Sequence, residues 1–235
     1  MIFEGDKTYL IRNFDTYNLC RNKHNDITTG DYTFIAKIKP NFDVVLDESD
    51  FYRGYVISKN GMHIGLYYTK LTSISGNKYE IGCSYCVNFN DESLFKNIDI
   101  KIDPTIDIFK ISMTHNIKNK TISLCVNDEI KTQTYEGDLF DYTNSWLWVG
   151  SGYGVNDNIS PFSYYYNGEI NYLGVFKKEL SVDQINKLLD NEIKFNYDSE
   201  FSPILICDFK EKTNYKIKDL TNNGNHLLLY DKKWV

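Results

Sequence analysis

The chain has 235 residues, of which 42% are hydrophobic and 15% are aromatic, and its formal net charge is −6. This composition is typical of a globular protein with a sizeable core rather than of a disordered chain. An acidic chain lacks the excess of Lys and Arg that binds nucleic acid or an anionic membrane surface, so we expect neither partner. Purely apolar runs span only a few residues, which predicts no membrane insertion.

The cysteines and the start of the chain bear on where the protein acts. The five cysteines are odd in number and irregularly spaced, which argues against a disulfide framework. Glu4, Asp6 and Lys7 leave no signal-peptide pattern after Met1. We expect a protein made in the cytoplasm that acts at an extracellular or virion surface. Abundant Asn, Ile, Lys and Tyr, with Ala only once, indicate an AT-rich genome of a low-GC bacterium or one of its phages.

Alternation of apolar and polar residues dominates the chain and predicts strands. In chain order they are expected at 33–39, 54–58, 62–68, 78–88, 109–114, 121–126, 129–134, 146–149, 169–176, 204–209 and 226–230. Asn60-Gly61 indicates a hairpin turn between the second and third strands, because both residues tolerate positive φ. No linker, repeat or composition break divides the chain, so residues 1–235 are expected to form a single domain.

One helix is expected in the C-terminal half. Ser181 followed by Gln184 is a capping-box pattern. Val182, Ile185 and Leu188 then recur at helical spacing, which predicts about three turns of amphipathic helix. We expect its apolar stripe to pack against a sheet edge. Many short antiparallel strands with a single short helix predict an all-β sandwich.

The order of several motifs resembles the laminin G-like domains of the concanavalin A-like lectin/glucanase superfamily. The stretches that carry the resemblance are 3–9, 30–40, 110–130, 148–170 and 176–189. This sequence departs from the family pattern at Lys37, where a Trp is common, and at Asp128, where a Gly is usual. The resemblance implies a two-sheet antiparallel jelly-roll sandwich with one short helix.

Two further stretches resemble known sequences. Residues 219–226 resemble a segment that precedes the first strand in many relatives, which implies that the same closing strand is supplied here from the other end. Residues 172–191 resemble the jelly-roll half of the clostridial neurotoxin receptor-binding region. Those toxins carry a ganglioside site on a β-trefoil, which this sequence does not contain, so that site is not carried over.

The acids do not show the spacing that the superfamily's glycoside hydrolases use. Retaining glycosidases need two carboxylates about 5 Å apart, and the family pattern resembles Glu-x-Asp-x-x-Glu. Glu48 and Asp50 lie in an acidic loop-like stretch, and Asp99 with Asp103 lacks a third acid. We therefore expect no catalysis and keep a glycoside hydrolase as the least favoured alternative. The four scattered histidines are expected at the surface or in turns, and Cys83-x-x-Cys86 is expected to hold structural thiols.

The segment 146–166 is the most suggestive for ligand binding. Alternation puts Trp146 and Trp148 on one face of a strand, and the family match turns Val149 to the core, so both tryptophans are expected on an outer face. Flat aromatic faces suit the C–H side of a sugar ring, and planar polar groups suit its hydroxyls. The expected ligand-binding residues are Trp146, Trp148, Tyr153, Asn156, Asp157, Tyr164 and Tyr166. These aromatic residues can equally pack within strands or bury against a partner in a homo-oligomer.

Calcium is a further expectation that the resemblance carries. Many jelly-roll lectins and laminin G-like domains hold calcium with Asp, Asn and backbone oxygens, which makes Asp157, Asn156 and Asn158 the candidate ligands. Our hypothesis is a non-catalytic binding or adhesion module that recognises a cell-surface glycan or cell-wall polysaccharide, partly by analogy of fold. The alternative is a structural or receptor-binding component of a phage particle or phage-like bacteriocin, with virion proteins as partners.

Overall fold

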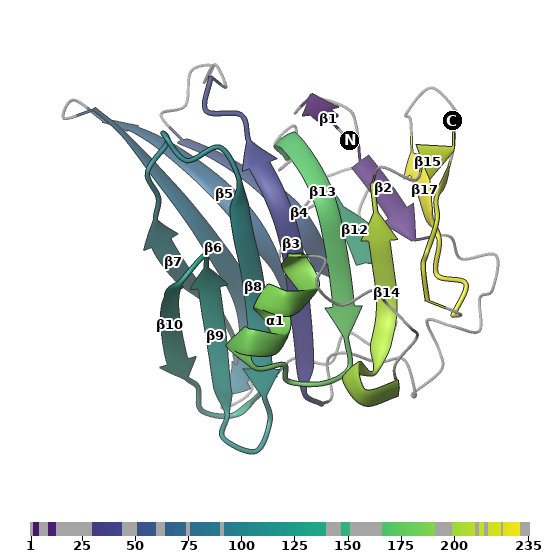
Figure 1. Ribbon diagram of the computed structural model, residues 1–235. Coiled ribbons are helices and arrows are strands. Elements are labelled where there is room, and N and C mark those ends of the chain that lie inside the picture. The colour runs from purple at the N-terminus through teal and green to yellow at the C-terminus, as the bar shows by residue number, and fades with distance from the viewer. Residues whose placement is uncertain are drawn as a thin grey trace.

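The protein folds as a β-sandwich (Figure 1). The structure is a computed structural model, and it describes residues 2–4, 9–12, 30–43, 51–59, 64–73, 76–89, 92–139, 147–150, 166–190, 199–209, 212–213, 216–221 and 223–230. These residues form two sheets, and every described strand pair is antiparallel. The predicted fold class, an all-β, two-sheet antiparallel jelly-roll sandwich with a short helix in the C-terminal half, is confirmed.

The smaller sheet has seven strands. In spatial order they are β1 (Ile2–Glu4) and β14 (Pro203–Asp208) on one side of β13 (Asn167–Phe176), then β3 (Tyr32–Pro40), β8 (Phe109–Asn116), β9 (Thr121–Val126) and β10 (Glu129–Thr134).

The larger sheet has ten strands. In spatial order they are β7 (Glu92–Lys101), β6 (Gly76–Phe89), β5 (Ile64–Ser73), β4 (Phe51–Lys59), β12 (Leu147–Val149), β2 (Tyr9–Arg12), β17 (Leu227–Tyr230), β16 (Lys216–Ile217) and β15 (Lys212–Thr213), with β11 (Asp138–Leu139) paired to the end of β6. Each strand predicted from alternation is present, although its ends move by some residues. β1, β2, β11, β15, β16 and most of β7 were not predicted from alternation.

The hydrophobic core lies between the sheets because successive residues of a strand point to opposite faces. In β3, Phe34 and Ala36 belong to this core, whereas Ile35 between them belongs to a second cluster on the outside of the smaller sheet. In the larger sheet the paired residues Ile57 and Leu66 are both fully buried in the main core. This pairing fixes which side chains of β5 face outward, whereas on β4 a bulge between Tyr55 and Ile57 shifts the alternation, so that Tyr55 also faces outward.

The helix α1 (Val182–Leu189) begins with the predicted capping box. Ser181 Oγ accepts a 3.3 Å hydrogen bond from the N–H of Gln184, and Gln184 Oε1 accepts one of 2.9 Å from the N–H of Ser181. The helix has eight residues and ends at the cap residue Asp190, so it is shorter than the three turns expected. A 3₁₀-helix, η2 (Ser199–Phe201), precedes β14. Of the helices within the described ranges, none has the length and apolar character needed to span a bilayer.

The packing of α1 differs from the expectation. Its buried residues contact Ile35 of β3, Phe176 of β13 and Ile206 of β14 in one cluster. The helix therefore covers the outer face of the smaller sheet rather than a sheet edge, as Figure 1 shows. The reason is that this face carries large apolar side chains where the strands cross beneath the helix, and burying them removes apolar surface from water.

The closing segment, described at residues 219–221 and 223–226, lies beside β14. Asp219 is 1% exposed, and its carboxylate accepts hydrogen bonds from the N–H groups of Ile206 (3.2 Å), Thr221 (2.9 Å) and Asn225 (2.8 Å). The hydroxyl of Thr221 donates a further bond of 2.7 Å to it. This carboxylate therefore ties the closing segment, which leads into β17, to the smaller sheet.

Candidate functional site

The outer face of the larger sheet is the face that points away from the smaller sheet. Residues paired across neighbouring antiparallel strands share a face. Ser58 on β4 pairs with Gly65 on β5, which pairs with Ser84 on β6, and this row lies on the side opposite the core residues that flank it. Trp148 on β12 pairs with Ser58, so the structure places it on the same outer face. Its neighbour Val149 is fully buried in the core.

Most of the other predicted site residues lie outside the described part of the chain. These are Trp146, Tyr153, Asn156, Asp157, Asn158 and Tyr164, so their roles in binding a ligand or calcium stay predictions.

Tyr166 does not lie on the surface, and its expected place in a ligand site is wrong. It is fully buried in the main core, and its N–H donates a 2.9 Å hydrogen bond to the carbonyl of Gly150. Burial raises the pKa of its phenol well above the usual value. Tyr166 directly precedes β13, and its side chain turns into the core between the two sheets, where a large ring buries apolar surface.

Two tyrosines on the outer face lean across the sheet in the same manner. Tyr55 on β4 donates a 3.2 Å hydrogen bond to Ser84 Oγ, two strands away on β6. Tyr67 on β5 donates one of 2.7 Å to Asp99 Oδ1, two strands away on β7. Each ring passes over a glycine of the intervening strand. A Cβ on Gly65 would lie 3.0 Å from the ring of Tyr55, and one on Gly82 would lie 2.5 Å from the ring of Tyr67.

The guanidinium of Arg53 lies over the ring of Tyr67. Its Cζ lies 4.1 Å from the centroid of the Tyr67 ring and 5.4 Å from that of Phe51. A guanidinium over an aromatic ring is stabilised by the ring's electron-rich face. No acidic side chain within the described ranges pairs with Arg53, and its Nε is buried without a hydrogen-bond partner there. The cation is thus held in place by rings and not neutralised by a carboxylate.

The exposure of each side chain on this outer face determines which of them a ligand can contact. Tyr55 and Tyr67 are at most 1% exposed, so they act as a support rather than as a contact surface. Arg53, Asp99 and Trp148 remain partly exposed. Burial raises the pKa of Tyr67 far above its usual value, so the phenol stays protonated and keeps donating to Asp99. The accessible groups on this sheet face therefore include a planar cation, a carboxylate and an indole.

The arrangement suits binding better than acid–base chemistry. The guanidinium can donate two parallel hydrogen bonds to a carboxylate. The acids considered for glycoside hydrolysis do not form a pair: Asp99 accepts from Tyr67, whereas Asp103 lies beyond the end of β7 and accepts from the N–H and hydroxyl of Thr105, which lower its pKa. Glu48 and Asp50 lie outside the described residues.

Other candidate ligands of the sequence take structural places. His115 was expected at the surface, but it is 1% exposed on β8, because both ring nitrogens find partners inside the protein. Cys83, Cys86, Cys125 and Cys207 are buried free thiols. In the described ranges no group of three His, Cys, Asp or Glu side chains could hold a metal ion.

Sequence reasoning did not single out Arg53, Tyr67 or Asp99. A signal was present in the two glycines, Gly65 and Gly82, inside strand patterns, since glycine within a strand often marks a close approach of another group. That signal alone does not tell which ring approaches.

Comparison with known proteins shows a shared fold. No protein-family model matches the chain, and no curated protein matches it in sequence. In structure it is similar to a Bacteroides ovatus protein provisionally described as carbohydrate-binding, with a TM-score of 0.61 and 13% identity over 97% of this chain. The chain spans 58% of the length of that protein.

The carbohydrate-binding module CBM40 of the Ruminococcus gnavus IT-sialidase is also similar, with a TM-score of 0.51, 14% identity and coverage of 79% of this chain and 97% of the module. The same module bound to α2,6-sialyllactose gives a TM-score of 0.52 at 14% identity, over 79% of this chain and 94% of the module. At these identities the likeness establishes the jelly-roll sandwich that these carbohydrate-binding modules share.

Proposed function

We propose that this protein is a non-catalytic module that binds cell-surface glycans through the outer face of its larger sheet. The observation that carries the proposal is the guanidinium of Arg53, which is stacked 4.1 Å above Tyr67 and lacks a carboxylate partner within the described ranges. A glycan with an acidic sugar can supply that carboxylate. The shared fold of a module solved with sialyllactose supports the same class of ligand.

The rest of the proposed face follows from its neighbours. Trp148 offers an indole one row away from Tyr55 and Tyr67, and Asp99 can accept hydrogen bonds from sugar hydroxyls. Of the residues predicted from sequence, Trp146, Tyr153, Asn156, Asp157 and Tyr164 remain proposed contributors, with calcium on Asn156, Asp157 and Asn158 as a proposed support. Membership of the concanavalin A-like, laminin G-like group is part of the same proposal and rests on motif order and fold.

Arg53→Met is the variant that tests the proposed face. The purified chain is applied to an array of acidic and neutral glycans and cell-wall polysaccharides, with calcium and with chelator. Wild type should retain acidic glycans, and Arg53→Met should lose them while keeping its thermal unfolding transition. Lys187→Met, which removes an exposed positive charge on α1, is the control and should bind as wild type does.

Two outcomes would refute this reading. If Arg53→Met retains acidic glycans, the proposed binding face is wrong. If wild type retains no glycan at all, the proposed glycan-binding function is wrong. The chelator arm decides whether calcium takes part.

A role in a phage particle or phage-like bacteriocin stays an alternative proposal, and it rests on the AT-rich composition. It is compatible with a glycan-binding face, since a receptor-binding protein at a virion surface also needs one. It predicts homo-oligomers, so sedimentation of the purified chain as a monomer would argue against it.

A further inference from the structure

A cavity of about 600 Å³ opens between the two sheets at their free edges, where β7 and β10 face each other. Tyr85 on β6 pairs with Lys96 on β7, and both lie on the inner side of the larger sheet, because Tyr85 is part of the main core. The lining residues that bear on ligand binding are Tyr85, Leu94, Lys96, Gln133, Tyr135 and Glu136. The cavity therefore lies at the inner face of the larger sheet, whereas Arg53 lies on its outer face. The two candidate sites are distinct.

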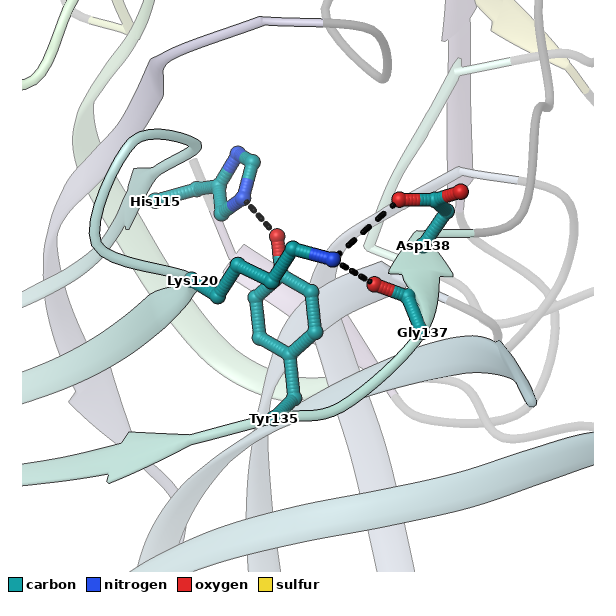
Figure 2. A network of polar contacts seen from close by, with 5 residues as sticks. All are labelled: His115, Lys120, Tyr135, Gly137 and Asp138. Atoms are coloured by element: carbon teal, nitrogen blue, oxygen red, sulfur yellow. Dashed lines mark hydrogen bonds and ion pairs between the residues drawn. The ribbon is translucent and has the colours of Figure 1, made fainter.

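The wall formed by residues 133–138 is anchored by a network that Figure 2 shows. His115 Nδ1 lies 2.7 Å from the carbonyl oxygen of Gly30, which only accepts, so Nδ1 carries the proton. Burial lowers the pKa of His115, so the ring is neutral and its Nε2 accepts the 2.7 Å hydrogen bond from the hydroxyl of Tyr135. Tyr135 is thereby fixed at the end of β10.

Three more hydrogen bonds fix the wall of the cavity. Lys120 Nζ donates to the carbonyl of Gly137 (2.5 Å) and to Asp138 Oδ1 (3.4 Å), which holds the chain after Tyr135 (Figure 2). The hydroxyl of Tyr85 donates a 3.0 Å bond to Gln133 Oε1 and so joins the two sheets across the cavity. Because these hydrogen bonds already order the wall, little conformational entropy is lost there when a ligand binds.

The polar groups that remain determine the ligand. Lys96 and Glu136 are exposed, and neither forms an ion pair within the described ranges, so the cavity presents one cation and one anion. Gln133 Oε1 is occupied by Tyr85, which leaves the amide nitrogen as a donor. Leu94 and the tyrosine rings supply the apolar side. A cation and an anion at one cavity do not favour a ligand with a net charge, whereas hydroxyl groups both donate to Glu136 and accept from Lys96 and Gln133.

We infer that this cavity is a second binding site, for a single neutral sugar ring. The volume lies within the range of about 300–1,000 Å³ that is typical of small-molecule sites. The site goes beyond the acidic-glycan face and does not depend on Arg53, because it lies at the other face of the same sheet.

A titration followed by backbone-amide NMR tests this site. The probes are the methyl glycosides of glucose, galactose and N-acetylglucosamine, and the acidic probe is sialyllactose. At least one neutral glycoside should give saturable shifts of the amides at 94–96 and 132–136. Lys96→Met and Glu136→Gln should each weaken that binding by about tenfold, the equivalent of one charged hydrogen bond. Lys187→Met and Asp183→Asn on α1 are matched controls and should leave it unchanged.

The readouts separate this site from the proposed face. Arg53→Met should remove sialyllactose shifts and leave the neutral-glycoside shifts at 132–136 intact. The inference is overturned if no glycoside of the panel gives saturable shifts at these amides, or if Lys96→Met and Glu136→Gln bind as wild type does. Loss of the neutral-glycoside shifts in Arg53→Met would also overturn it, because the two sites would then be one.

Discussion

Tyr67 reaches across a whole strand to Asp99, and the 2.7 Å hydrogen bond between them joins β5 to β7 over the backbone of β6. The ring lies above Gly82, where a Cβ would come within 2.5 Å of it. Arg53 in turn lies above the ring. The partly exposed guanidinium of Arg53 therefore lies over a ring that can occupy its position only because residue 82 has no side chain.

Gly82→Ala should disturb this support. The added methyl collides with the Tyr67 ring and with Asp99, and overpacking of this kind costs about 1–3 kcal/mol of unfolding free energy. Urea unfolding measures the cost, and binding of acidic glycans should weaken in parallel. Gly30→Ala is the matched control, because nothing lies within 4 Å of its Cβ and its backbone needs no positive φ.

The cause of that cost can be isolated with a double-mutant cycle. In a Tyr67→Ala background the ring is gone, so most of the cost of Gly82→Ala should disappear. An equal cost in both backgrounds would show that the ring over Gly82 is not what the methyl meets.

Asp219→Ala should destabilise the protein far more than removal of an exposed acid. It leaves the buried N–H groups of Ile206, Thr221 and Asn225 without their acceptor, at about 1–3 kcal/mol for each unsatisfied group. We expect a loss of at least about 3 kcal/mol of unfolding free energy. Asp107→Ala, which removes an exposed ion pair with Lys39, should cost less than about 1 kcal/mol. Similar costs for the two variants would contradict the structural role of Asp219.

The elements of the fold were predictable where the signal is local. Ser181 and Gln184 specify the start of α1 by their spacing, and Pro40 ends the alternation of β3. β7 was missed because Lys96 occupies an inward position between Leu94 and Ile98, and this interrupts the apolar alternation that predicts a strand. The same lysine lines the cavity between the sheets, so the break in the pattern coincides with a candidate binding residue.

The candidate site was not predictable, because it depends on register. A two-residue turn at Asn60-Gly61, continued without irregularity, would pair Arg53 with Tyr68 and put Tyr67 on the opposite face. The structure instead pairs Lys59 with Ile64, and a bulge between Tyr55 and Ile57 shifts the pairing by one, so that Arg53 pairs with Thr69. A one-residue shift reverses the face of every following side chain. Only the tertiary structure brings Arg53 and Tyr67 together.

Ser181→Ala should loosen α1 without unfolding the sandwich. The hydroxyl accepts from the N–H of Gln184, and loss of such a cap costs about 1 kcal/mol. Since the helix has only eight residues, amide hydrogen exchange in 182–189 should accelerate while the strands stay protected. Ser181→Asp keeps an acceptor at the cap and should exchange as slowly as wild type. Unchanged exchange in Ser181→Ala would mean that packing on the sheet alone holds the helix.

The buried His115 should make stability depend on pH. Burial lowers its pKa in the folded state, so the folded protein binds fewer protons at this site than the unfolded chain. The stabilisation is present above the ordinary histidine pKa of about 6.5 and is lost as the pH falls towards the lowered value of the folded state. The carboxylates of Asp31 and Glu179 act on the His115 pKa in the opposite direction and do not cancel the lowering by burial.

Urea unfolding at about pH 7 and about pH 5 should show that wild type loses more unfolding free energy than His115→Gln, which cannot titrate. The variant will be less stable at both values, because it loses the partner of Tyr135, but that loss is independent of pH. If both proteins lose the same unfolding free energy between these two pH values, carboxylates elsewhere, and not His115, are responsible for the loss of stability in acid.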